Sequence, residues 1–201
     1  MKTLFIGISG VAGSGKDLFF KLLKDELDKK NINTHRYSLA DSLKQECNDY
    51  LKVHHNIDIF NCTRAEKDSV RPFLVFHGTM KRGVSKGRHW IELLDNQIKL
   101  DGHTGVICVT DIRYDKFEGD EVDWIKNELN GILVHVNQEG IAPANEEEAS
   151  QNPQLLKKSD YRIEWKSEEG GQKEIESQLT EKHIVKFTDW LLHDYGYRLS
   201  E

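Results

Sequence analysis

The sequence has few cysteines, few prolines and no long apolar run. Its three cysteines, Cys47, Cys62 and Cys108, are odd in number and lie far apart along 201 residues. This excludes a disulfide framework and the close Cys/His spacing of a zinc site, and it indicates a reducing compartment. No stretch of about 18 apolar residues offers a membrane span, and the first apolar run is too short for a signal peptide. We therefore expect a cytoplasmic protein with no membrane partner.

A surplus of basic residues is also lacking. Lys and Arg total 28 against 34 Asp and Glu, which gives a net charge of -6. Nucleic-acid binders normally carry a basic surplus or a basic stripe, so we expect no nucleic-acid partner. Apolar residues make up 37% of the chain and charged residues 31%. This composition is typical of a globular protein, and the length suits a single domain over residues 1–201.

Short apolar runs alternate with segments of helical periodicity along most of the chain. The runs predict strands at 4–8, 34–38, 106–109, 132–136 and 161–165. Helical spacing of apolar residues covers 16–29, 39–51, 90–98 and 122–129, and a long amphipathic helix follows Gly171. Ser69 is a candidate cap for a further helix with Pro72 in its first turn. Strands that alternate with helices predict an α/β fold with a parallel sheet.

The first strand runs into a glycine-rich turn that fits the pattern G-x-x-x-x-G-K at residues 10–16. Glycines allow backbone N–H groups to point at phosphate oxygens, and the helix that follows adds the positive end of its dipole. The lysine of the pattern reaches the β- and γ-phosphates of a nucleotide. The residues that we expect to hold ATP are Gly10, Val11, Ala12, Gly13, Ser14, Gly15, Lys16, Asp17 and Leu18.

Asp17 stands where most phosphate loops have a Ser or Thr whose hydroxyl binds Mg²⁺. A carboxylate is also a hard oxygen ligand, so Asp17 can bind the ion directly or through water. Alternatively, it stabilises the N-terminal end of the helix that it opens. Both interpretations stay open.

The sequence G-S-G-K-D after a strand resembles the phage deoxynucleoside monophosphate kinases and also the phosphomevalonate kinases of animals. Three more segments resemble the phage kinases: residues 38–44, residues 71–82 and residues 109–113. A weaker likeness covers Glu147 or Glu148 and residues 159–163, where the Asn-x-Gly that follows in the family is replaced by residues 164–166. The resemblance runs from about residue 3 to 165. It implies a three-layer α/β/α P-loop fold of the NMP-kinase type around a mostly parallel five-stranded sheet.

Asp111 and Arg113 lie at the end of the strand that covers 106–110. Ligands bind at the carboxyl ends of strands in open α/β sheets, so Asp111 can hold Mg²⁺ through water, with an N-cap or turn role as the alternative. The Arg113 guanidinium suits phosphate oxygens, with an exposed surface position as the alternative. The residues proposed for catalysis are Lys16, Asp17, Asp111 and Arg113, and those proposed for metal binding are Asp17 and Asp111.

The family segments also mark side chains for the phosphate acceptor. Two phosphates must approach against their mutual repulsion, which requires several cations. The residues expected to bind the acceptor are Asp41, Lys44, Arg71, Arg82, Trp90 and Arg113. Asp41 can instead cap a helix, and Trp90 can belong to the core rather than stack on a base. The helical region at about 39–100 is expected to bind the monophosphate, and the aperiodic, acidic segment 138–158 to form a mobile loop or lid.

The resemblance implies an ATP- and Mg²⁺-dependent kinase that converts a deoxynucleoside monophosphate to the diphosphate, in the host cytoplasm if a phage encodes it. The alternatives are a kinase for phosphomevalonate or another small phosphorylated metabolite, and a non-enzymatic nucleotide-binding switch. The basic residues favour an acceptor site over a switch. The family likeness also implies that a homodimer is possible.

Overall fold

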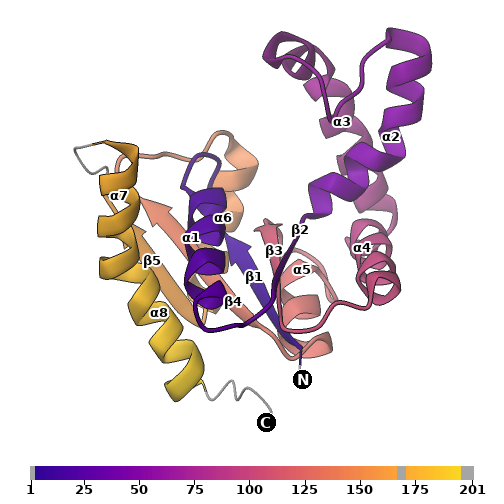
Figure 1. Cartoon of the computed structure of the whole chain (residues 1–201). Coiled ribbons are helices and arrows are strands. Elements are labelled where there is room, and N and C mark those ends of the chain that lie inside the picture. The colour runs from indigo at the N-terminus through magenta and orange to yellow at the C-terminus, as the bar shows by residue number, and fades with distance from the viewer. Residues whose placement is uncertain (1–2, 167–170, 196–201) are drawn as a thin grey trace.

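The computed structural model describes residues 3–166 and 171–195, and its centre is one five-stranded sheet (Figure 1). The strands are β1 (Leu4–Ser9), β2 (Thr34–Tyr37), β3 (Val106–Ile112), β4 (Ile132–Gln138) and β5 (Tyr161–Trp165). Their order is β2-β3-β1-β4-β5, and every neighbouring pair is parallel. All five predicted strands are confirmed, as is the parallel sheet.

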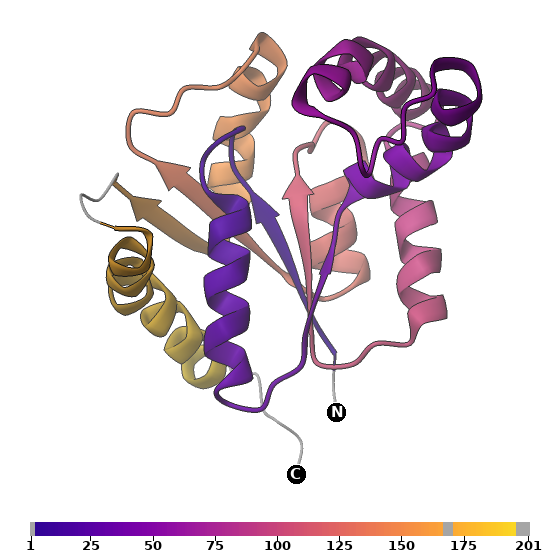
Figure 2. The same ribbon diagram turned by 45° about the horizontal axis from the view of Figure 1, so that its top comes forward.

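Helices cover both faces of the sheet because the central strands are apolar on both sides. One face packs against α1 (Lys16–Asp28), α7 (Gln172–Leu179) and α8 (Val185–Asp189), whose buried side chains include Phe19, Leu23 and Phe187. The other face packs against α4 (Arg88–Asp101) and α5 (Glu121–Asp123). π-helical turns at 124–128, 180–184 and 190–194 extend these helices. The three-layer α/β/α architecture is therefore confirmed (Figure 2).

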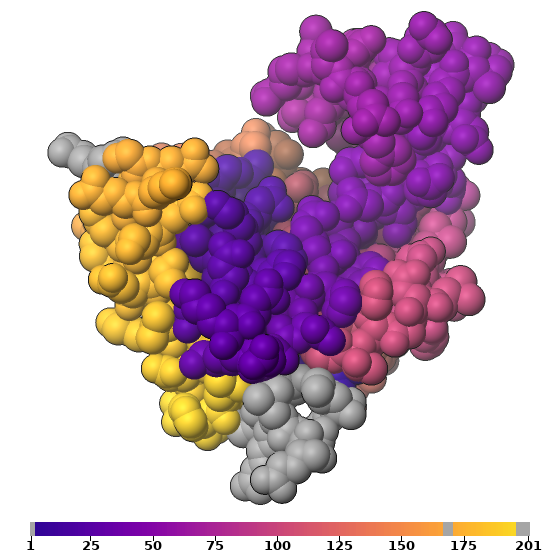
Figure 3. Space-filling view, in the orientation of Figure 1, coloured from indigo at the N-terminus to yellow at the C-terminus, as the bar shows by residue number. Residues whose placement is uncertain are grey.

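Two helices, α2 (Leu39–His55) and α3 (Arg64–Val84), project beyond the edge of the sheet as an arm (Figures 1 and 3). A small core of their own, which includes Cys47, Leu51 and Val70, holds them together. The arm arises from the segment between β2 and β3, so it stands above the carboxyl ends of the strands. This places it opposite the turn that follows β1.

The start of α3 corrects the prediction that Ser69 caps this helix. The helix begins at Arg64, because Thr63 and Glu66 form a capping box in which each side chain binds the backbone N–H of the other residue. Pro72 consequently lies inside the helix rather than in its first turn.

The segment 138–158 is not aperiodic throughout, which corrects a second expectation. Residues 146–158 form α6 (Glu146–Lys158). The Asn145 side chain caps this helix by accepting the N–H of Glu148 at 2.8 Å. Three glutamates in the first turn also stabilise the helix, because their negative charges lie at the positive end of its dipole. Within the described residues, no helix is both long enough and apolar enough to cross a membrane.

Candidate phosphate and acceptor site

The turn between β1 and α1 contains three glycines with positive φ angles, and at two of them, Gly10 and Gly15, there is also no space for a side chain. Gly10, Gly13 and Gly15 have φ angles of 141°, 81° and 86°. A Cβ on Gly10 would lie 2.2 Å from the carbonyl oxygen of Val136, and one on Gly15 would lie 2.4 Å from the Trp165 ring. Side chains at these positions would therefore both strain the backbone and collide with β4 and β5.

Buried polar contacts hold this turn in place from below. The Trp165 indole N–H donates to the carbonyl oxygen of Ser14 at 2.9 Å. The Ser9 hydroxyl lies 3.0 Å from Nδ1 of His135 on β4, and burial with the nearby Lys16 charge lowers the pKa of His135 to about 4. His135 is therefore neutral at physiological pH and adds no charge beneath the turn.

The strand, turn and helix have the arrangement that is typical of a phosphate-binding loop. Its glycines lie directly after the buried strand β1, and its end opens α1, as such a loop requires. The fold is that of a P-loop protein.

Lys16 bends back over the loop that precedes it. Its ammonium donates to the carbonyl oxygens of Gly10 at 2.9 Å and Val11 at 2.7 Å. Burial and the nearby Arg113 guanidinium lower the pKa of Lys16 from its ordinary value. The ammonium therefore lies directly above the loop, where nucleotide phosphates bind in P-loop proteins.

Glu148, from the first turn of α6, also contacts the loop. Its Oε2 accepts the backbone N–H of Ala12 at 3.2 Å and that of Ala144 at 3.0 Å. Its Oε1 lies 3.7 Å from Nη1 of Arg113. Sequence reasoning noted Glu148 only as part of a weak family pattern, because nothing local in the sequence shows that α6 folds against a loop 136 residues away.

The two carboxylates predicted for metal binding occupy different environments. The Asp17 side chain is 88% exposed and lies 3.6 Å from Nη2 of Arg36. Asp111 accepts hydrogen bonds from the Ser38 hydroxyl at 2.9 Å and from the N–H groups of Leu39 and Ala40 at 2.8 Å each. Asp111 thus lies within β3 and binds the start of α2, a helix more than 70 residues away in the sequence, rather than capping a helix of its own segment. In the part of the chain that the structure describes, no cluster of three or more His, Cys, Asp or Glu can hold a metal by itself.

A cavity of about 230 Å³ lies between the arm, the end of β3 and α6. Four residues predicted from the sequence line it: Arg82, Trp90, Asp111 and Arg113. Its apolar wall consists of Leu39, Ala40, Leu43, Leu74, Val75 and Trp90. Arg113 also lines a small crevice with Gly10 and Val11, so this residue connects the cavity with the phosphate loop.

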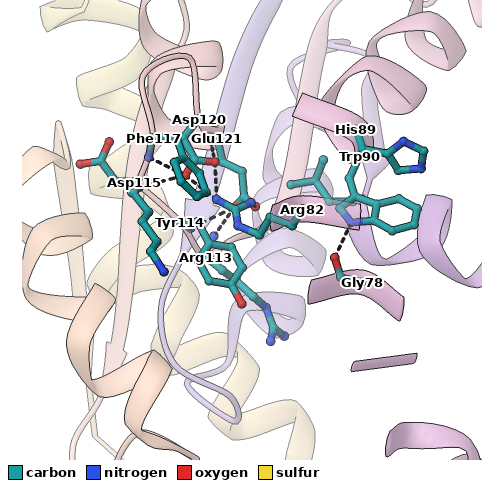
Figure 4. A network of polar contacts seen from close by, with 12 residues as sticks. Gly78, Arg82, His89, Trp90, Arg113, Tyr114, Asp115, Phe117, Asp120 and Glu121 are labelled. Carbon is teal, nitrogen blue, oxygen red and sulfur yellow. Dashed lines mark hydrogen bonds and ion pairs between the residues drawn. The ribbon is translucent and has the colours of Figure 1, made fainter. Parts of the chain in front are cut away.

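Arg82 lines the cavity, but its charge is already paired (Figure 4). The guanidinium binds the buried carboxylate of Asp120 and lies 2.8 Å from Oε1 of Glu121. It also lies 3.7 Å above the centre of the Tyr114 ring. Burial raises the pKa of Glu121, while the Arg82 guanidinium and the Arg113 N–H hold this rise back. Arg82 therefore connects the arm to the loop after β3, and sequence reasoning missed Asp120 and Glu121 as its partners.

Three predicted acceptor residues do not reach this cavity. Arg71 is on the outer surface of α3, 60% exposed and 3.2 Å from Asp68. Lys44 pairs with Asp41 at 2.6 Å, and Asp41 also binds Arg36. Asp41 instead lines a second cavity of about 530 Å³ between α2 and α4. Trp90 reaches the acceptor cavity but is mostly core, with its indole N–H donated to the Gly78 carbonyl oxygen at 3.2 Å.

No protein-family model matches the chain, and no curated protein sequence matches it. Among solved structures, a shikimate kinase from Aquifex aeolicus is 14% identical, with 94% of this chain and 99% of that chain covered and a TM-score of 0.44. A shikimate kinase from Bacteroides thetaiotaomicron is 15% identical, with 94% of this chain and 98% of that chain covered and a TM-score of 0.43. An APS kinase from Mycobacterium tuberculosis is 15% identical, with 94% of this chain and 98% of that chain covered and a TM-score of 0.37.

Proposed function

We propose that this protein is a kinase that transfers the γ-phosphate of ATP to a deoxynucleoside monophosphate, giving ADP and the diphosphate. The observation that carries the proposal is the position of Arg113, which lines both the phosphate-loop crevice and the adjoining cavity. A cation shared by two sites suits a reaction in which two phosphates meet. The sequence resemblance of residues 38–44, 71–82 and 109–113 supports the choice of acceptor.

The loop residues Gly10 to Lys16 would hold the β- and γ-phosphates through backbone N–H groups and the Lys16 ammonium. When phosphates arrive, that ammonium exchanges its two loop carbonyl partners for phosphate oxygens. Phosphoryl transfer needs positioning and charge stabilisation more than proton transfer, so a fixed loop with one mobile cation suits the reaction.

The carboxylates present fit a bound Mg²⁺. This ion commonly takes one or two protein carboxylates together with substrate phosphates and water, and the exposed Asp17 beside Lys16 offers one. Asp111 accepts three hydrogen bonds already, which suits a contact through water. Bound there, the ion would neutralise charge on the phosphates.

The acceptor would lie in the cavity between the arm and β3, with its phosphate at Arg113. There the guanidinium would hold the attacking phosphate in line with the γ-phosphate on the loop. The apolar wall of the cavity would surround the rest of the acceptor, and α6 would cover the crevice and keep water from the γ-phosphate.

The size and lining of the cavity favour a second candidate within the same chemistry. About 230 Å³ is below the usual range of ligand pockets, and one part of the wall consists of the aliphatic side chains of Leu39, Leu43, Leu74 and Val75. A compact phosphorylated metabolite such as phosphomevalonate would need fewer polar partners than a nucleobase. The arm would have to move less to accept it.

The decisive experiment measures ADP release from Mg-ATP with one acceptor at a time. The panel consists of dAMP, dGMP, dCMP, dTMP, their ribose counterparts and phosphomevalonate. Fast release with a deoxynucleotide supports the main proposal and defines base choice. Release with phosphomevalonate alone supports the second candidate. Tight ATP binding with no acceptor-dependent release would contradict both and indicate a nucleotide-binding switch.

A further inference from the structure

The phosphate loop already binds an anion, and that anion belongs to the chain itself. The Glu148 carboxylate accepts the N–H of Ala12, a backbone donor of the glycine-rich turn proposed to bind phosphate, at 3.2 Å. The other carboxylate oxygen faces Arg113 at 3.7 Å. A loop donor and the cation at the acceptor boundary thus share one carboxylate.

The position of the Glu148 carboxylate beside the loop is fixed by burial and by hydrogen bonds. Its side chain is only 13% exposed. The Ala144 N–H donates to the same oxygen at 3.0 Å, and the Asn145 cap fixes the first turn of α6 through the Glu148 N–H. The turn before α6 and the helix itself therefore both direct Glu148 at the loop.

The Lys16 ammonium is also paired within the loop. Lys16 donates to two loop carbonyl oxygens, and the Glu148 charge acts on the Lys16 ammonium in the direction that raises its pKa. A phosphate that enters the loop would meet the Glu148 negative charge at close range. The two anions cannot share the Ala12 N–H without strong repulsion.

We propose that the Glu148 carboxylate occupies a phosphate position of the loop in the nucleotide-free protein, and that ATP must displace it and move the first turn of α6. This rests on the proposed binding of ATP at the loop. Displacement makes the first turn of α6 a nucleotide-responsive element: this turn contacts the loop through Glu148 and shifts to make room for bound phosphates, while the rest of the helix still covers the crevice. It also lowers ATP affinity, because binding includes the cost of breaking the internal contact.

The test compares Glu148→Gln with the wild-type full-length protein by calorimetric titration without Mg²⁺. Glutamine keeps the size and one acceptor oxygen but removes the charge. We expect the Kd of ATP and that of tripolyphosphate to fall by a similar factor, roughly three- to tenfold, and that of adenosine to stay unchanged. Amide exchange at Ala12 and Ala144 should become faster in the nucleotide-free variant.

Glu146→Gln is the matched control. It removes the same charge from the same helical turn, and the Glu146 side chain is exposed and has no polar partner within the described residues. It should leave all three affinities within about twofold of the wild type. Equal ATP affinity in Glu148→Gln and the wild type would overturn the inference. So would weaker ATP binding by Glu148→Gln, because the carboxylate would then assist the nucleotide. If the wild-type protein binds neither ATP nor tripolyphosphate, the proposed function itself fails. This result differs from the one in which the wild type and Glu148→Gln bind ATP equally well.

Discussion

The carboxylate of Asp111 accepts the backbone N–H of Leu39 at 2.8 Å, so the end of β3 caps the first helix of the arm. The same carboxylate accepts the next N–H along the helix and the Ser38 hydroxyl. The cap therefore joins the sheet, next to the phosphate loop, to the helices that line the acceptor cavity. Together with the contacts of Arg82 with Asp120 and Glu121, this carboxylate orients the arm relative to the turn between β1 and α1.

Asp111→Asn should therefore destabilise the protein and loosen the arm. The amide keeps one oxygen acceptor but loses the charge and presents a donor where another acceptor is needed. We expect a loss of about 1–2 kcal/mol in the free energy of unfolding, measured by urea denaturation, with faster amide exchange at the start of α2. Asp68→Asn, on the exposed face of α3, is the control and should cost less than about 0.5 kcal/mol. Equal losses in the two variants would contradict the capping role.

Lys16→Met should abolish most acceptor-dependent turnover and leave the fold intact. Methionine preserves much of the apolar stem but removes the charge that the γ-phosphate needs. We expect kcat to fall by at least about 100-fold, with only a small change in melting temperature. The control is Lys21→Met. Lys21 lies on the same helix as Lys16 and forms an exposed ion pair with Glu176 of α7, so this variant should keep nearly full activity. Normal turnover by Lys16→Met would rule out the loop as the γ-phosphate site.

The sequence was sufficient to predict the sheet and the phosphate loop because their signals are local. Apolar runs such as 106–109 are buried on both faces, and a Cβ added at Gly10 or Gly15 would lie less than 2.5 Å from another atom. The cap at Thr63 was also encoded locally, in the spacing from Thr63 to Glu66, but the prediction relied on Ser69 and Pro72 instead. The helix α6 was missed because its apolar periodicity is weak and its start depends on the Asn145 side chain.

The positions of the residues proposed to bind an acceptor were harder to predict, because their pairing depends on tertiary structure. Arg71 and Arg82 lie on one helix, and each matched a basic position of the family pattern. Only the fold shows that Arg82 meets Asp120 and Glu121, whereas Arg71 faces outward. Partners nearly 40 residues apart in sequence leave no periodic signal.

Substitutions of Arg113 and Arg71 provide a kinetic test of the proposed acceptor site. Arg113→Ala should raise the KM of the acceptor at least tenfold and change the KM of ATP less, because the guanidinium is proposed to hold the acceptor phosphate. Arg71→Ala should leave both constants unchanged, since its side chain lies on the exposed face of α3. Unchanged acceptor KM in Arg113→Ala, or a large effect of Arg71→Ala, would move the acceptor site away from the cavity.

Arg82 is expected to matter for stability more than for binding. Arg82→Met would leave the buried carboxylates of Asp120 and Glu121 without their cation, which should cost about 3–5 kcal/mol. Thermal and urea unfolding measure this loss. Arg71→Met on the same helix should cost less than about 0.5 kcal/mol. A stable Arg82→Met protein with a raised acceptor KM would instead assign Arg82 to the acceptor, as the sequence pattern suggested.

The last prediction concerns acid stability and Glu46, which joins the three helices α2, α3 and α4. Its two carboxylate oxygens accept hydrogen bonds from Nε2 of His77 and of His89 at 2.8 Å each, and Lys81 lies 3.2 Å away. Burial raises the pKa of Glu46, but these hydrogen bonds outweigh it and bring the pKa down to about 2. The ordinary value is 4.5. A carboxyl group whose pKa is lowered on folding stabilises the protein above its unfolded pKa, and this stabilisation is lost as the pH falls toward the folded pKa.

We therefore expect the free energy of unfolding to fall between pH 4.5 and pH 2, partly through Glu46. Glu46→Gln should be less stable than the wild type at pH 6, by on the order of 1–2 kcal/mol, and the difference should shrink as the pH approaches 2. Glu118→Gln, an exposed site with no polar partner within the described residues, should show no such convergence. A gap between Glu46→Gln and the wild type that stays constant with pH would show that Glu46 contributes packing alone, and that protonation of this carboxylate does not weaken the arm.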